Sequence, residues 1–155
     1  MQYPESPRKT KEEHVNNYRD WGIQLGRRFR ALKLWFVIRS FGVSGLQEKL
    51  RYHIKLANNL KEKIKSENDF ELMAPVKFNV ICFRYKPPWI DDNEELNKIN
   101  ETILSKINDS GKLFVTHTKL NGKYVIRFVT GQTNVNEIHV DKAWELIKKI
   151  SRDSG

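Results

Sequence analysis

The sequence predicts an α+β domain in which about four antiparallel strands form one sheet with helices packed on one face. Segments 70–75 and 76–85 follow each other directly, and both read as strands. Segments 113–120 and 123–130 flank Asn121 and Gly122, the dipeptide favoured in a type I′ hairpin turn. Consecutive strands and a tight hairpin indicate antiparallel pairing. In segment 76–85 the alternation places one set of side chains on the same face: Val76, Phe78, Val80 and Cys82.

The first part of the chain is predicted to be helical. Residues 25–42 read LGRRFRALKLWFVIRSFG, with apolar side chains on every side of a helical wheel, so this helix needs cover over most of its surface. Gly42 ends it. Ser44 followed by Gln47 has capping-box spacing and starts a second helix. From Leu46 to Ile64 apolar residues recur every three or four positions, which predicts a long amphipathic helix.

Two further helices are predicted in the second half. Asp92 with Glu95 caps the first, and Gly111 ends it. Its apolar side consists of Leu96, Ile99, Ile103 and Ile107. Asn134 with Glu137 caps the last helix. The apolar side of that helix consists of Val140, Ala143, Trp144, Ile147 and Ile150.

Composition sets broad limits on location and class. With 155 residues, a single domain with its own core is expected. The net charge of +9 favours solubility and weak attraction to polyanions. The single cysteine, Cys82, excludes an internal disulfide and fits a reducing compartment. The polar N-terminus has no apolar signal-peptide core, and no apolar run approaches the roughly 20 residues of a membrane span. We therefore expect a cytoplasmic protein with no membrane partner.

The residues alone give no convincing active site. The four histidines are far apart and form no metal-binding pattern, so no metal site is expected. There is no phosphate-binding glycine motif and no nucleophile-elbow motif. Cys82 lies in an apolar strand and reads as a packed side chain. Lys33, among apolar residues, could suit a Schiff base, although a lysine whose stem covers apolar surface is the simpler interpretation.

Five cations lie between residues 27 and 39 with no acid among them. Basic residues mixed with aromatic ones suit single-stranded nucleic acid. Here, however, the aromatic residues are flanked by leucine, valine and isoleucine, which indicates a packing surface. We expect no nucleic-acid partner, and a basic nucleic-acid-binding domain stays the weaker alternative.

Three long colinear segments carry a family resemblance: YRDWGIQLGRRFRALKLWFVIRSFGVSGLQEKLRYHIKLANNL, FELMAPVKFNVICFRYK and GKLFVTHTKLNGKYVIRFVTGQTNVNEIHVDKAWELI. Over these the chain resembles the group II pyridoxal-phosphate-dependent amino-acid decarboxylases, in particular the aromatic-L-amino-acid decarboxylases. The resemblance implies the C-terminal small domain of a fold-type-I enzyme, which works as an obligate homodimer with active sites at the subunit interface.

The resemblance also implies a division of the chain. Residues 1–17 would be a polar lead-in, the remnant of a mobile catalytic-loop region. There the sequence PESPRKT holds Ser6 where the family has a tyrosine, and Tyr3 lies nearby. Residues 18–43 would be a helical segment that links the large domain to the small one. Residues 44–155 would be the small α+β domain itself.

The same resemblance implies a C-terminal fragment of a carboxy-lyase that is inactive alone. The family's Schiff-base lysine follows a histidine, and no His-Lys pair occurs here. We therefore expect no catalytic or cofactor-binding residue in this chain, and pyridoxal 5′-phosphate only in the full-length enzyme. The expected partner is the large domain, or a second chain that supplies it, with self-association through the apolar segment otherwise. The resemblance implies interdomain or active-site-side contacts for Arg27, Arg28, Arg30 and Arg127. A non-enzymatic dimerisation or regulatory module is the alternative.

Overall fold

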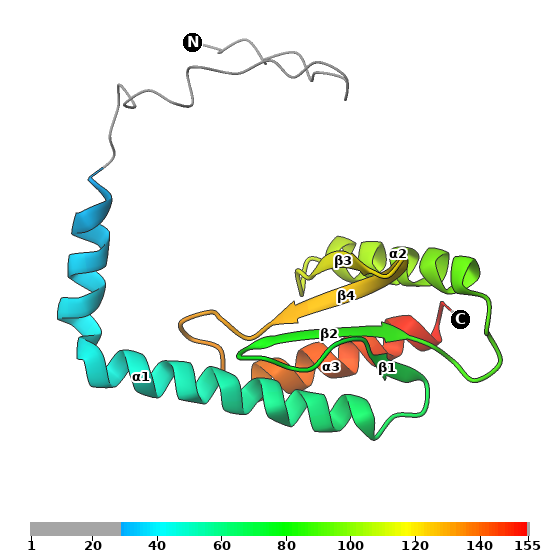
Figure 1. Cartoon of the computed structure of the whole chain (residues 1–155), viewed down its shortest axis with the longest axis horizontal. Coiled ribbons are helices and arrows are strands. Elements are labelled where there is room, and N and C mark those ends of the chain that lie inside the picture. Colours follow the sequence, from blue (N-terminus) through cyan, green and yellow to red (C-terminus); the bar gives the residue numbers. More distant parts are fainter. Residues whose placement is uncertain (1–28, 155) are drawn as a thin grey trace, which may run out of the picture.

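The computed structural model describes residues 29–154, which form one four-stranded antiparallel sheet and three helices. The strands lie in the order β1-β2-β4-β3, and each neighbouring pair is antiparallel (Figure 1). The elements in chain order are α1 (Arg30–Lys65), β1 (Phe70–Leu72), β2 (Val80–Tyr85), α2 (Asn93–Asp109), β3 (Thr116–Leu120), β4 (Lys123–Val129) and α3 (Glu137–Arg152). The predicted α+β class is confirmed.

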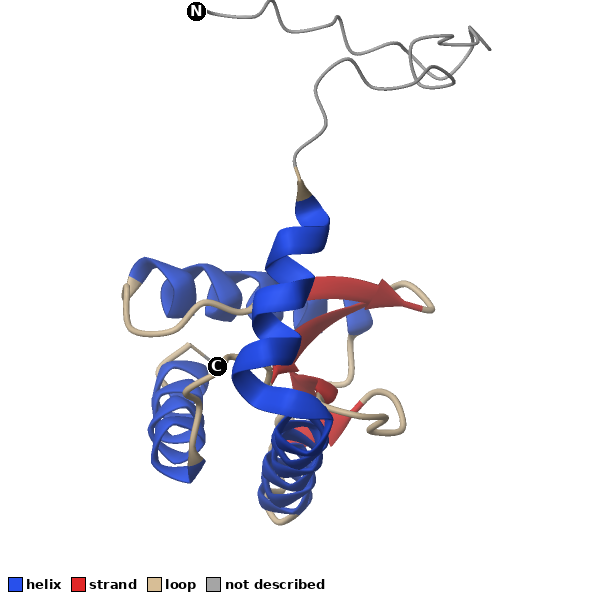
Figure 2. Cartoon of the chain, turned by 90° about the vertical axis from the view of Figure 1, so that its left-hand side faces the viewer, coloured by secondary structure: helices blue, strands red, loops and turns tan. Residues whose placement is uncertain are grey.

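One face of the sheet carries the hydrophobic core, and the three helices lie on that side of the strands (Figure 2). Ile81 and Phe83 of β2 and Ile126 of β4 are fully buried in a cluster with residues of all three helices. Trp144 of α3 packs against Phe83, with ring centroids 5.8 Å apart. Because side chains alternate along a strand, the intervening residues point to the opposite side of the sheet, which we call the open face.

Gly42 divides α1 into two parts. Its φ of 65° and ψ of 176° are not helical, and only glycine adopts this backbone region without strain. The part before the kink and the part after it run in different directions (Figure 1). We call residues 29–43 the arm. The predicted break at Gly42 is confirmed, and the second part is amphipathic as expected, although Leu50 on it is 62% exposed.

Hairpin and cap predictions are confirmed at two places. Asn121 and Gly122 have φ values of 51° and 77°, as a type I′ turn requires. The Asp92 side chain accepts the backbone N–H of Glu95 and caps α2. The cap of α3 was predicted wrongly: Asn136, two residues after Asn134, accepts the N–H of His139.

The predicted strand 76–85 was also partly wrong. β2 begins at Val80, and Phe78 before it has a φ of 55°, which turns the chain out of the extended conformation. The core face of β2 consists of Ile81, Phe83 and Tyr85, and Val80 and Cys82 lie on the open face. The sequence alone does not indicate which residues of β2 face the core, because all four residues from Val80 to Phe83 are apolar.

Two asparagines of α2 bond this helix to β2 and β4 at the end of the sheet where these two strands no longer pair with each other. β2 and β4 pair only as far as Phe83 opposite Ile126. Beyond that point, the buried Asn100 side chain accepts the N–H of Tyr85 and donates to its carbonyl, both at 2.8 Å. Asn97 bonds to the backbone of β4, where its Oδ1 accepts the N–H of Tyr124 at 2.6 Å. Side-chain amides thus replace the missing strand partner.

Candidate functional site

The open face presents an apolar patch with one arginine at its centre. Cys82 of β2 lies directly opposite Arg127 of β4, and Val80 lies opposite Val129. Arg127 is exposed, and its Nε donates to Thr116 Oγ1 of β3 at 3.1 Å. We call the four residues Val80, Cys82, Arg127 and Val129 the open-face patch. Among the described residues the bond to Thr116 is the one hydrogen bond of the Arg127 guanidinium, so its other N–H groups can donate to an acceptor from outside the domain.

The segment before α2 covers one end of the open face. Arg84, on the same side of β2 as Cys82, is only 2% exposed. Its guanidinium contacts Glu71 Oε2 at 2.9 Å and donates to Asn93 Oδ1 at 3.1 Å. Arg84 therefore has its charge paired within the domain, whereas Arg127 keeps its charge available at the surface.

Burial and charge act in opposite directions on the thiol of Cys82. Partial burial raises the pKa of Cys82 above its usual value, and the positive charge of Arg127 opposes this by a smaller amount. At neutral pH the thiol is therefore protonated. A nucleophilic cysteine needs the opposite arrangement, a lowered pKa in a cationic, solvent-accessible setting. Cys82 is accordingly part of a contact surface.

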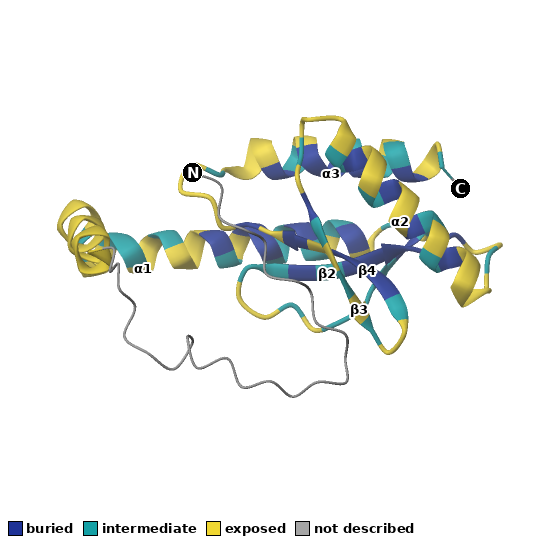
Figure 3. Ribbon diagram, turned by 90° about the horizontal axis from the view of Figure 1, so that it is seen from above, coloured by how far each residue is buried: buried dark blue, intermediate teal, exposed yellow. Residues whose placement is uncertain are grey.

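The arm exposes large apolar side chains on several sides (Figure 3). Trp35 is 54% exposed and Phe36 is 57% exposed, and their rings pack edge to face against each other. The Arg39 guanidinium lies 5.8 Å from the centre of the Trp35 ring. The other strongly exposed apolar residues of the arm are Phe29, Leu32, Leu34, Val37, Ile38, Phe41 and Val43. Contiguous apolar surface of this kind marks a binding interface.

Of the four predicted arginines the structure describes Arg30 and Arg127, and no bond joins these two. Arg30 lies at the start of the arm, exposed, and Arg127 lies on the open face. Within residues 29–154 neither of them pairs with a carboxylate. Arg27 and Arg28 lie outside the described residues, as do Tyr3, Ser6 and the whole lead-in 1–17. The predicted contact roles of these arginines stay predictions.

The described residues do not fit a covalently bound pyridoxal phosphate. An aldimine lysine is desolvated or has its pKa lowered by a cationic neighbour. None of the lysines in residues 29–154 is buried. Lys148, the most enclosed of the ion-paired lysines at 18% exposure, contacts Glu67 and Glu145, and these bonds raise its pKa. This is the reverse of what the chemistry needs, so no step of a reaction is assigned to this lysine.

Metal and membrane functions also find no support in the described part of the chain. Among these residues no three His, Cys, Asp or Glu side chains gather closely enough to hold a metal ion. Nor is any described helix long and apolar enough to cross a bilayer. What the domain offers is contact surface: an apolar arm and an open-face patch with one free guanidinium.

Longer known proteins contain a region of similar sequence and fold. The model of the pyridoxal-dependent decarboxylase conserved domain matches residues 7–86. Tyrosine decarboxylase 2 of Narcissus pseudonarcissus is 43% identical over 94% of this chain, and tryptophan decarboxylase 2 of Oryza sativa subsp. japonica is 45% identical over 86%. The crystal structure of Oryza sativa TDC with PLP and tryptamine superposes with a TM-score of 0.78 and 36% identity over 87% of the chain.

Helices cover one face of the small sheet, and the arm and Arg127 of the open face are exposed among the described residues. The chain belongs to the pyridoxal-dependent decarboxylase family. It spans 29% of the length of the Narcissus relative, 27% of the first Oryza relative and 29% of the superposed crystal chain. The predicted family resemblance is confirmed.

Proposed function

We propose that this chain is the supporting C-terminal part of a pyridoxal-phosphate-dependent decarboxylase of aromatic L-amino acids. The main support is the identity of 43–45% to a tyrosine and a tryptophan decarboxylase over most of the chain. The chain supplies contact surface, and the cofactor and the reacting groups are held by the part of the enzyme that this sequence does not contain. In this role the chain alone forms no aldimine and releases no carbon dioxide.

The arm and the open-face patch are the surfaces proposed to meet that missing part. Burial of the exposed rings of Trp35 and Phe36 would stabilise the contact, because apolar area removed from water contributes about 25 cal/mol per Å². Arg30 and Arg127 would orient it by donating to carboxylates or other anionic groups across the interface.

The domain division proposed here places the boundary at the kink. Gly42 separates the arm from the amphipathic part of α1, and this agrees with a linking segment that ends at residue 43. The helix after the kink belongs to the small domain, because His53, Leu56 and Leu60 are buried against the sheet or its loops. The cytoplasmic location and the homodimeric state of the whole enzyme are part of the same proposal.

Complementation tests this function directly. The chain is co-expressed with the Oryza sativa relative from which the matching C-terminal part has been removed, and carbon dioxide release from L-tyrosine and L-tryptophan is measured. We expect activity only when both chains are present. A double substitution in the arm, Trp35→Ser with Phe36→Ser, should abolish it, whereas the exposed Lys55→Gln on the second part of α1 should not. Activity of the chain alone would contradict the proposal, and so would two soluble chains that never associate.

A dimerisation module without catalytic partner is the second candidate, and the exposed arm is the observation that favours it. In that case two copies of this chain would cover each other's arms, and no chain of another kind would be needed to protect the arm from solvent. Stable homodimers that neither bind the truncated relative nor restore its activity would favour this candidate over the first.

A further inference from the structure

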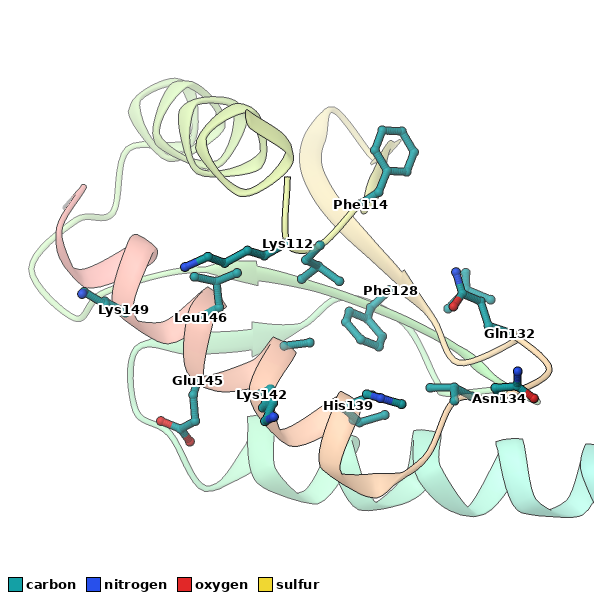
Figure 4. Close-up of a pocket in the computed structure, with 15 residues that line it drawn as sticks. Lys112, Phe114, Phe128, Gln132, Asn134, His139, Lys142, Glu145, Leu146 and Lys149 are labelled. Atoms are coloured by element: carbon teal, nitrogen blue, oxygen red, sulfur yellow. The ribbon is translucent and has the colours of Figure 1, made fainter. Parts of the chain in front are cut away.

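A pocket of about 760 Å³ lies between α3 and the end of β4. It exists because β3 pairs with β4 only as far as Thr116 opposite Arg127. Beyond that point Phe128 and Val129 have no β3 partner, and the segment before β3 turns away from them. The pocket opens between this segment, the end of β4 and α3 from His139 to Lys149 (Figure 4).

The floor and walls of the pocket are apolar. Phe128 lies at the centre of the lining residues, with α3 on one side and Phe114 on the other (Figure 4). Phe114 is 78% exposed, which is unusual for a phenylalanine next to a concave apolar surface. The remaining apolar lining residues are Leu113, Val129, Val135, Val140, Ala143 and Leu146. Pockets of a few hundred to 1,000 Å³ with mainly apolar walls are typical small-molecule sites.

The rim of the pocket carries an uncompensated positive charge. Three lysines, Lys112, Lys142 and Lys149, line it against one acid, Glu145, which leaves a charge of +2. Glu145 is itself ion-paired to Lys148 at 2.9 Å, and Figure 4 shows its carboxylate directed away from Phe128. Within residues 29–154 none of the three lysines has a carboxylate partner. All three ammonium groups are exposed and can donate to a bound anion.

We propose that this pocket binds a hydrophobic organic anion, with an aromatic or aliphatic body on Phe128 and Phe114 and a carboxylate or sulfonate between the lysines. The apolar lining excludes a small inorganic anion as the best ligand, since that would leave the pocket unfilled. The charge of the rim disfavours cations and gives an anion an advantage over a neutral compound of the same shape. This proposal does not depend on the proposed function, because the pocket contains no residue of the arm and shares only Val129 with the open-face patch.

Titration of the full chain with anilinonaphthalene sulfonate, followed by amide chemical shifts, tests the site. We expect saturable one-to-one binding, with shifts concentrated in residues 112–114, 128–135 and 139–149. Laurate should compete for the same residues. The neutral phenylnaphthylamine, which has the same rings without the sulfonate, should bind at least several-fold more weakly, and added salt should reduce the difference.

Variants separate the pocket from the arm, which also exposes apolar surface. Exchanging the rim lysines for glutamine should weaken anion binding about two- to five-fold for each lysine. Phe114→Ser should weaken the anion and the neutral compound alike. These side chains are exposed, so folding is preserved. The matched control Lys55→Gln should have no effect. Shifts confined to the arm, or equal affinity for the anion and the neutral analogue, would overturn the proposal.

Discussion

Asn100 offers the sharpest test of how the sheet and α2 are joined. Its side chain is completely buried and satisfies both the N–H and the carbonyl of Tyr85, each at 2.8 Å. Asn100→Ala removes both partners at once. A buried polar group left without a partner costs about 1–3 kcal/mol, so two of them cost about 2–6 kcal/mol. That is a large part of the stability of a small domain.

Asn97→Ala is the matched control. Asn97 lies one helical turn earlier and also makes two hydrogen bonds to backbone: it donates to Gly122 O of the hairpin turn at 3.0 Å and accepts from Tyr124 N of β4 at 2.6 Å. Because Asn97 is only half-buried, water can replace its side chain, and the net loss should be about 1–3 kcal/mol. Both changes gain the same small helix-propensity advantage of alanine, which cancels in the comparison.

Urea unfolding measures both free energies. The measurement is best made in the Trp35→Ser, Phe36→Ser background at low concentration, so that association through the arm does not add to the stability. The denaturant slope should stay the same in both asparagine variants. Hydrogen exchange at the Tyr85 amide should accelerate only in Asn100→Ala. If Asn100→Ala costs no more than Asn97→Ala, then Asn100 does not hold the separated strands, and the reasoning is refuted.

Three further predictions concern the surfaces. The pKa of the Cys82 thiol should lie above that of a free cysteine, and its ultraviolet absorbance against pH measures this. Arg127→Met should raise the pKa of Cys82 further, because a positive charge is lost. A lower pKa of Cys82 in this variant would contradict the assigned cause. Sedimentation velocity should detect concentration-dependent self-association that Trp35→Ser with Phe36→Ser abolishes, and an unchanged monomer at high concentration would argue against it. Gly42→Ala should either cost about 1–3 kcal/mol or straighten α1, and spin-label distances across the kink would detect the straightening. If the variant shows neither effect, the backbone at residue 42 does not require glycine.

The sequence was sufficient for the elements whose signals are local. The Asn121-Gly122 turn, the Asp92 cap and the break at Gly42 each depend on a few neighbouring residues, and all three were predicted correctly. Which side chains of β2 point to the core could not be predicted from neighbouring residues. Because apolar residues stand on both of its faces, only the pairing with β4 determines that Ile81 and Phe83 face the helices.

The candidate site depends on contacts between residues that are far apart in the sequence. The sequence predicted that the arm needs cover, from its all-round apolar pattern. It gave no signal that Cys82 would lie opposite Arg127, or that Arg84, two residues later, would be the arginine with an internal partner. The pocket beside α3 was missed for a similar reason. Lys112, Lys142 and Lys149 are separated by up to 37 positions in the sequence, and they line one pocket only because β3 stops at Thr116.

Reductive trapping with borohydride tests most directly the claim that this domain supports a cofactor chemistry it does not itself perform. The purified chain is incubated with pyridoxal 5′-phosphate, reduced, digested and mapped by mass spectrometry. We expect low, non-saturating labelling spread over several exposed lysines, unchanged by L-tyrosine or L-tryptophan. A single lysine labelled to one equivalent per chain, and protected by either amino acid, would contradict it.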